Sequence, residues 1–125
     1  MNVAITPEPE FLRAEVSGEF SLAEAERTFL EVLEAIDVHK NEKVLFDGRQ
    51  ITGELTTMER FYYGEFVALN LSRYSEQSGH PAPQFAYVLQ EPVLDPERFG
   101  ETVAANRGMN VKAFDNLEAA VEWLR

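Results

Sequence analysis

The chain has 125 residues and carries 11 Lys and Arg against 22 Asp and Glu, which gives a net charge of −11. This length fits one domain of ordinary size, so we expect a single domain over residues 1–125. The negative charge repels phosphate backbones and anionic lipid surfaces, which argues against nucleic acid as a partner. Because the chain has no cysteine, disulfides, thiolate metal sites and cysteine nucleophiles are excluded.

The first ten residues lack both the basic start and the apolar run of a signal peptide. No window approaches the roughly 20 apolar residues of a membrane-spanning helix. We therefore expect a soluble, cytoplasmic protein with no stable membrane insertion.

Two apolar runs, 3–6 and 11–20, open the chain, and the second alternates between apolar and polar residues. This pattern predicts an antiparallel hairpin with one half-exposed strand. Ser21 and Glu24 then have the spacing of a capping box, and the apolar residues that follow share one helical face. A first helix is predicted over 22–36.

The middle of the chain predicts a buried strand over 43–47 that ends at Asp47 and Gly48. A loop over 48–55 leads to a second capping box, formed by Thr56 and Glu59, which opens a helix rich in aromatic residues. Residues 75–83 are expected to form a surface loop.

The last third of the chain repeats the order of strand and helix. A strand is expected over 85–89 and a helix over 96–107, which Pro96 begins and Gly108 ends. The final strand is predicted over 110–114, and a third capping box, Asp115 with Glu118, opens the last helix.

This alternation predicts an α/β fold with a mostly parallel five-stranded sheet, an N-terminal antiparallel hairpin and four helices. In such sheets, ligands usually bind at the carboxyl ends of the parallel strands. Here those ends are 47–50, 90–91 and Asp115.

The order of elements resembles that of a STAS domain, the fold shared by sulfate transporters and anti-sigma-factor antagonists, and more closely its bacterial SpoIIAA-like branch. The resemblance covers nearly the whole chain. Its more specific parts are the strand 44–47 before Ile51, Thr52 and Gly53, and the C-terminal segment 111–124. The resemblance implies a small non-enzymatic module that regulates a protein partner or binds a ligand.

In anti-sigma-factor antagonists, a partner kinase phosphorylates a serine at the start of the helix that follows the central strand. The resemblance places Thr56 at the phosphoacceptor position and Thr57 after it, while Leu55 and Met58 stand where an acidic residue and glycine are usual. Thr56 also suits a plain helix cap, worth about 1 kcal/mol, and a phosphate there would be compatible with the helix dipole. Thr56 and Thr57 are therefore candidate phosphoacceptors, with a cap alone as the simpler interpretation.

The segment Asp47, Gly48, Arg49 carries a carboxylate and a guanidinium beside two glycines, Gly48 and Gly53. One interpretation is a turn in which Asp47 and Arg49 pair with each other. The other is an anion or ligand loop of Asp47, Gly48, Arg49, Thr52 and Gly53, completed by backbone amides near Thr56 and Thr57.

The second helix carries more aromatic surface than one core-facing stripe needs. The excess predicts an apolar pocket or an interface, such as a homodimer contact, and the residues concerned are Phe61, Tyr62, Tyr63, Phe66 and Tyr74. The alternative is ordinary core packing of this helix.

The remaining chemistry is sparse. His39 and His80 are far apart in polar loops, so no metal site is predicted, and no cofactor-binding motif is found. An enzyme would have only Asp47 as a plausible acid or base, so we expect a non-catalytic regulatory or binding module. The alternative function is a carrier or sensor of a small hydrophobic or lipid-like ligand.

Overall fold

We describe a computed structural model of the chain, which covers the backbone of residues 1–125 and the side chains of all but residues 99 and 100. Along this described backbone, five strands and four helices alternate. Their order is β1 (Asn2–Pro7), β2 (Leu12–Glu19), α1 (Leu22–His39), β3 (Lys43–Thr52), α2 (Thr57–Ser78), β4 (Gln84–Val88), α3 (Phe99–Asn106), β5 (Val111–Phe114) and α4 (Leu117–Leu124).

The strands form one sheet in the order β1-β2-β3-β4-β5. Strand β1 pairs with β2 in the antiparallel sense, and every later pair is parallel. The predicted α/β fold with a mostly parallel five-stranded sheet, an N-terminal hairpin and four helices is confirmed.

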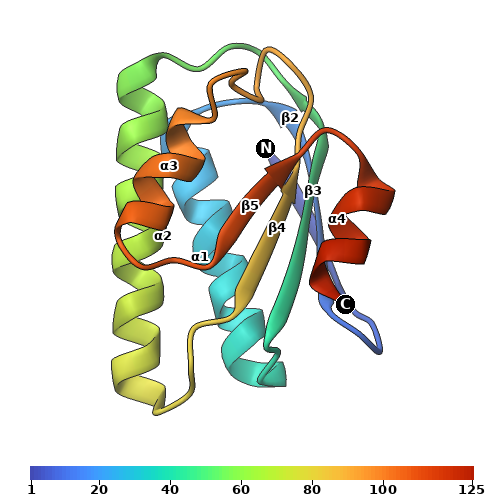
Figure 1. Cartoon of the computed structure of the whole chain (residues 1–125), viewed down its shortest axis with the longest axis vertical. Coiled ribbons are helices and arrows are strands. Elements are labelled where there is room, and N and C mark those ends of the chain that lie inside the picture. The colour runs from blue at the N-terminus through green and yellow to red at the C-terminus, as the bar shows by residue number, and fades with distance from the viewer.

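Helices cover the two faces of the sheet unequally. Figure 1 shows α1, α2 and α3 on one side and the short helix α4 alone on the other. Alternate residues of β3 point to opposite faces: Val44 and Phe46 join the core under α1–α3, whereas Leu45 packs with Leu124 of α4. The molecule is therefore a three-layer α/β/α arrangement.

Strand β3 is longer than predicted. It continues through Asp47 and Gly48 to Thr52, paired with β2 as far as Glu19, whereas its pairing with β4 stops at the Asp47–Val88 pair. A register shift between Glu15 and Ser17 of β2 accompanies the extension. The prediction that the strand ends at Asp47 and that a loop begins at Gly48 was wrong.

Glycine at position 48 is explained by the neighbouring side chains and not by a turn. A Cβ atom at Gly48 would lie 2.6 Å from Leu89 Cδ2 and 2.8 Å from Ile51 Cδ1. Those two side chains occupy the space over the glycine, so a residue with a side chain would fit only if they shifted.

Several helix boundaries differ from the prediction, and α1 already runs to His39, three residues beyond its predicted end. Helix α2 continues to Ser78 and ends at Gly79, which has a φ of 73°, so the expected loop over 75–83 is shorter. Helix α3 begins at residue 99 and not at Pro96, after Arg98 with a φ of 58°. Asn116, not Asp115, caps α4 through its side-chain oxygen, which accepts from the Ala119 amide at 2.9 Å.

The capping boxes have different outcomes. The box of Thr56 and Glu59 at the start of α2 is confirmed in both of its hydrogen bonds. At α1 the Ser21 hydroxyl caps the Glu24 amide, but the Glu24 carboxylate accepts from the amino group of Met1 and so does not complete the box. No helix in the described part of the chain is long and apolar enough to cross a membrane.

Candidate functional site

Asp47 and Arg49 form an internal ion pair on the face of the sheet that α4 partly covers. Arg49 Nε donates to Asp47 Oδ1 and Arg49 Nη2 donates to Asp47 Oδ2, both at 2.9 Å. The backbone amide of Arg49 also donates to Asp47 Oδ1, at 3.2 Å. This geometry corresponds to the simpler interpretation of the segment, in which the two charges satisfy each other.

The surroundings of Asp47 shift the pKa of its carboxyl in opposing directions. Burial alone would raise that pKa, but the hydrogen bonds from Arg49 and the charges of Arg49 and Arg13 hold it below its usual value. Asp47 is therefore a carboxylate at neutral pH, held by a fixed cation.

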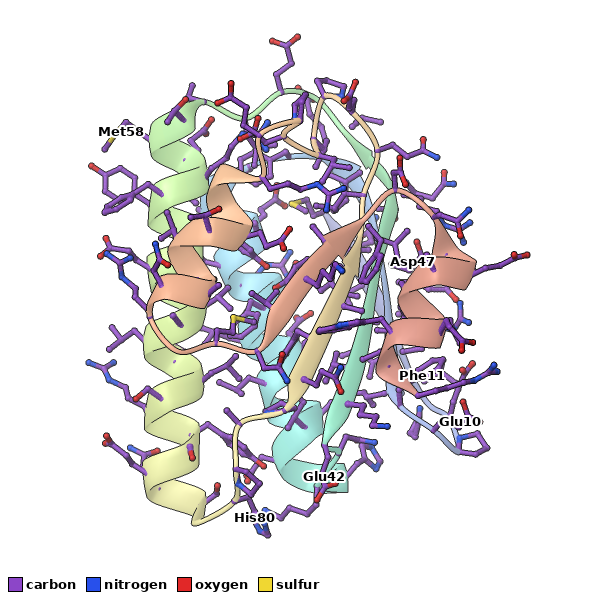
Figure 2. The ribbon with its side chains drawn as sticks, in the orientation of Figure 1. Glu10, Phe11, Glu42, Asp47, Met58 and His80 are labelled. Atoms are coloured by element: carbon purple, nitrogen blue, oxygen red, sulfur yellow. The ribbon has the colours of Figure 1, made fainter. Side chains whose placement is uncertain are left out.

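The predicted anion loop is not brought together as one site. Asp47 and Arg49 lie on the α4 face of the sheet, whereas Thr56 and Thr57 begin α2 on the other face, as Figure 2 shows for Asp47 and the neighbouring Met58. Thr52 is exposed at the end of β3, and Gly53 follows with a φ of 97°. The amides at the start of α2 therefore do not complete a site with the Arg49 guanidinium.

Thr56 and Thr57 are both exposed at the first turn of α2, but they differ in their contacts. The Thr56 hydroxyl accepts from the Glu59 amide at 3.1 Å, and the Glu59 carboxylate accepts from the Thr56 amide at 2.8 Å. Thr57 takes no part in this box. Thr56 thus serves as the helix cap that its sequence position predicts.

The predicted aromatic residues of α2 separate into different environments. Tyr63 is partly buried and packs against the core, while Tyr62 is half exposed and Phe61 packs edge-on against it. Phe66 contacts Phe29 of α1 and borders a surface groove together with Tyr62, and Tyr74 is buried in the core farther along the helix. Of the five aromatic residues, Tyr63 is the one that lines a cavity with mostly apolar walls.

That cavity lies between α2, α3 and the sheet, with a volume of about 120 Å³. Its floor includes Phe46 and Tyr87, whose rings stack at a centroid distance of 4.4 Å. Most of the other walls are aliphatic or aromatic; the lining residues are Met1, Phe20, Ala25, Phe46, Ile51, Leu55, Arg60, Tyr63, Gly64, Val67, Tyr87, Leu89, Val93, Leu94, Asp95, Arg98, Glu101, Ala104, Met109, Val111 and Ala113.

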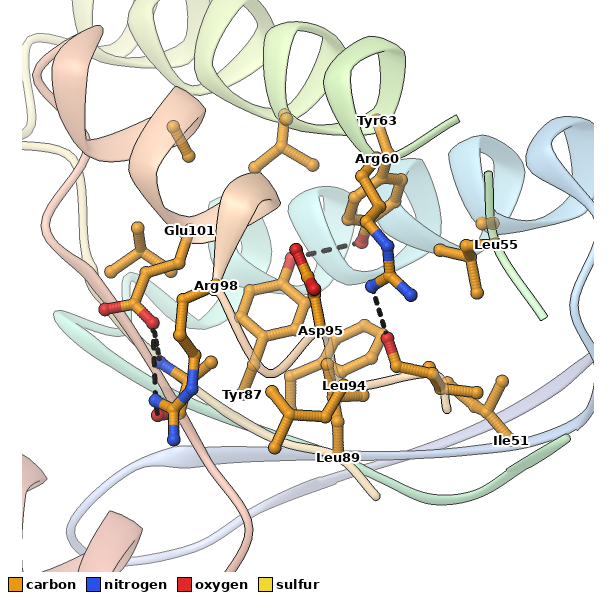
Figure 3. A pocket seen from close by; sticks show the side chains of 18 of the residues that line it. Ile51, Leu55, Arg60, Tyr63, Tyr87, Leu89, Leu94, Asp95, Arg98 and Glu101 are labelled. Atoms are coloured by element: carbon orange, nitrogen blue, oxygen red, sulfur yellow. Dashed lines mark hydrogen bonds and ion pairs between the residues drawn. The ribbon is translucent and has the colours of Figure 1, made fainter. Parts of the chain in front are cut away.

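The segment between β4 and α3, residues 89–98, covers one side of the cavity with Val93 and Leu94 turned inward and buried. Arg60 of α2 holds this cover in place. Its Nη1 donates to the Val93 carbonyl at 2.6 Å, and its Nη2 donates to the Pro92 carbonyl at 2.8 Å (Figure 3). Two backbone carbonyls that lie outside regular structure are thereby satisfied by one side chain.

A second arginine closes the opposite end of the cover. Arg98 donates to the Ala113 carbonyl of β5 and pairs with Glu101 at 3.5 Å, while the Glu101 carboxylate also accepts from the Ala113 amide at 3.2 Å. The left-handed backbone of Arg98 directs the turn into α3 at this point. The cover is thus fastened to α2 by one arginine and to β5 by the other.

Sequence reasoning missed most residues of this cavity. Arg60, Asp95, Arg98 and Glu101 come from three separate segments, and none belongs to a recognisable motif. One signal was available: Arg60 lies three residues before Tyr63, so both fall on the same face of α2.

Comparison with known proteins gives a family match and a structural likeness. The family model described as SpoIIAA-like matches residues 11–125. The crystal structure of an anti-sigma factor antagonist from Mycobacterium paratuberculosis superposes with a TM-score of 0.60 at 14% sequence identity, covering 99% of this chain and 93% of that chain. At this identity the likeness concerns the fold. The comparison with curated proteins finds no match.

Proposed function

Because the chain belongs to the SpoIIAA-like family of STAS domains, as its sequence resemblance predicted, we propose that it is a non-catalytic binding module that holds one small apolar molecule between α2, α3 and the sheet. This was the alternative function at the level of sequence. The cavity lined by Tyr63 and Tyr87 is the observation that favours it over the other candidates.

The size and lining of the cavity support the proposal. A volume of about 120 Å³ is close to that of an engineered apolar cavity of about 150 Å³ that binds benzene. Sites for small molecules are typically concave and mostly apolar, with a few polar groups that orient the ligand. The cavity has this composition, so a molecule about the size of one six-membered ring suits it.

The covering segment supplies a route of entry. Residues 89–98 lack regular secondary structure over most of their length and are fastened by arginine side chains to α2 and β5. Opening this segment breaks these hydrogen bonds and exposes the buried side chains of Val93 and Leu94, but it does not separate β3, β4 and β5. Entry therefore requires a local movement and not unfolding of the sheet.

The test uses toluene as a probe and a pair of variants in α3. Ala104 lines the cavity, while Ala105, the next residue, is exposed. In an NMR titration, toluene should shift the amide resonances of Tyr63, Val67 and Tyr87 in a saturable way in the natural protein and in Ala105→Leu. Ala104→Leu should abolish those shifts, because the added methyl groups fill the space.

The same titration can contradict the proposal. If millimolar toluene produces no saturable shift in the natural protein, or if Ala104→Leu binds as well as Ala105→Leu, the cavity is not a binding site. Circular dichroism of both variants establishes that each is folded before the titrations are compared.

We keep a second candidate function, the control of a protein partner through phosphorylation of Thr56 or Thr57. Two observations favour it: both residues are exposed, and the fold is similar to that of a protein described as an anti-sigma factor antagonist. The half-exposed side chains of Tyr62 and Leu69 on the same helix offer a surface for that partner or for a second copy of the chain. A helix N-terminus also favours the added negative charge.

Intact-mass measurement after incubation with cell lysate and ATP tests this candidate. A phosphate on the natural protein that is lost in Thr56→Ala or Thr57→Ala supports the switch. An unmodified mass in lysates with demonstrated kinase activity argues against it.

A further inference from the structure

Two tyrosine hydroxyl groups meet at the mostly apolar cavity. Tyr63 reaches in from α2 and Tyr87 from β4, and their Oη atoms are 3.1 Å apart. The rings lie nearly perpendicular, at 88°, with their centroids 6.4 Å apart (Figure 3). The pair is the meeting point of a helix and a central strand, so its position is fixed by the core on both sides.

The two hydroxyls have more hydrogen-bonding capacity than their mutual contact uses. Each O–H is one donor and also an acceptor, so one hydrogen bond between them consumes one hydrogen and leaves the other. Among the residues whose side chains are described, the structure gives neither hydroxyl a second partner. A buried donor without an acceptor is unfavourable, so an incoming acceptor would be stabilised there.

Both hydroxyls keep their hydrogens at physiological pH. Burial raises the pKa of Tyr63 and of Tyr87 well above the usual value for tyrosine. The pair therefore offers a neutral donor, and it does not offer a phenolate.

The charged groups at the rim do not favour an anionic guest. The terminal nitrogens of Arg60 already donate to backbone carbonyls, and Arg98 is engaged by the Ala113 carbonyl and by Glu101. The carboxylates of Asp95 and Glu101 offset these two cations at the rim, and the whole chain carries a net charge of −11. A carboxylate or phosphate would thus lose its hydration and gain only guanidinium groups that are already partly engaged.

We propose that the ligand of this cavity is a neutral molecule of about one ring in size that presents a hydrogen-bond acceptor, such as a ketone or ester oxygen, to the Tyr63–Tyr87 hydroxyl pair. This inference rests on the proposed function and specifies the chemical class of its ligand. The apolar walls hold the ring, and the hydroxyl pair fixes its orientation.

Three probes of nearly the same shape test the inference: acetophenone, α-methylstyrene and benzoate. The first two differ only in an oxygen that replaces a methylene group, and benzoate adds a negative charge. Dissociation constants are measured by NMR titration for the natural protein and for the double variant Tyr63→Phe/Tyr87→Phe. This variant keeps the aromatic walls and removes both hydroxyls together, which leaves no unpaired partner behind.

The informative quantity is the ratio of the affinities for acetophenone and α-methylstyrene. Dividing the ratio of the natural protein by that of the double variant cancels the different hydration of the two probes. We expect this quotient to be about three to ten in favour of the ketone, the effect of one neutral hydrogen bond. Benzoate should bind more weakly than acetophenone to the natural protein.

The outcomes separate this inference from the proposed function. If acetophenone and α-methylstyrene bind but the quotient is one, the hydroxyl pair does not recognise the ligand and the inference is overturned, while the cavity remains a binding site. If benzoate binds more tightly than acetophenone, the ligand is an anion and the inference is likewise wrong. If none of the three probes binds, the proposed function fails together with it.

Discussion

The two faces of the sheet use the same two strands, β3 and β4, in different ways. On the α4 face, Leu45, Ala86 and Leu124 are completely or almost completely buried against one another. On the opposite face, Phe46 and Tyr87 of the same strands border a cavity of about 120 Å³. A short helix that fits closely over the strands yields a packed layer, whereas an irregular segment held by arginines leaves usable space. The two faces therefore differ in how closely their covers pack against the strands.

The strand pairing explains why the space lies at this end of the sheet. Strand β3 stays with β2 as far as Thr52 but leaves β4 after Asp47. Residues 89–98 occupy the region that continued pairing would have filled. The cavity therefore lies where β3 and β4 separate.

Truncation of a leucine on each face should give the largest difference in the free energy of unfolding. Leu45→Ala removes a fully buried side chain from the packed α4 face and should lower the free energy of unfolding by about 2–5 kcal/mol. Leu94→Ala enlarges a cavity that already exists and should cost less. Urea denaturation of both variants measures the difference; a greater loss for Leu94→Ala would mean that the cover, not the α4 face, is the tightly packed layer.

Removal of the Arg60 guanidinium should loosen the cavity cover alone. Arg60→Met keeps an unbranched side chain but loses the hydrogen bonds to the Pro92 and Val93 carbonyls, which should cost about 1.5–3 kcal/mol. Amide hydrogen exchange should speed up in residues 93–95 more than in β4. Arg73→Met, an exposed position on the same helix, is the control and should change neither quantity. Equal exchange in both variants would show that Arg60 does not fasten the cover.

The Asp47–Arg49 pair on the α4 face should give a pH-dependent contribution to stability. Because the pKa of Asp47 is lower in the folded state than in the unfolded chain, its stabilising effect is complete above the unfolded value of about 3.9 and is lost as the pH falls through the folded value. Asp47→Asn should therefore be less stable by about 1.5 kcal/mol at pH 7, with a deficit that shrinks below pH 4.

Denaturant unfolding at several pH values checks this expectation, with Asp37→Asn as the matched control. Asp37 pairs with Lys40 on the exposed surface of α1 and should contribute little. A deficit of Asp47→Asn that stays constant from pH 7 to pH 3 would mean that the carboxylate charge is not what stabilises this face.

The cap of α2 should give the smallest of these effects. Thr56→Ala removes the acceptor for the Glu59 amide and should cost about 1 kcal/mol, whereas Thr57→Ala, outside the box, should be nearly neutral. Thermal unfolding of the two variants measures the difference. Equal melting temperatures would show that the box adds nothing to the stability of α2.

The sequence predicted the fold well because its signals are local. Helix caps such as Thr56, and the helical spacing of Phe29, Val32 and Ile36, depend on neighbours within a few residues. The errors occurred where a distant residue decides the outcome. Gly48 resembles a turn residue, yet it lies within β3, where Leu89, 41 positions later, fills the space above it.

The candidate site was predictable only in part, for the same reason. Tyr63 could be singled out because the second helix carries more aromatic residues than its core face requires. Its partner Tyr87 is a strand residue with an ordinary apolar neighbourhood, and Arg60 and Arg98 act on backbone carbonyls 33 and 15 residues away along the chain. No spacing rule connects residues that tertiary structure alone brings together.

The missing side chain at Gly48 has a consequence for the shape of the cavity. Gly48 is not itself a wall residue, but Leu89 and Ile51, which touch the space above it, both are. An alanine at position 48 would push the side chains of Leu89 and Ile51 into the cavity. The cavity would then be shallower, although none of the residues that line it has changed. Position 48 thus limits the depth of the cavity although it does not line it.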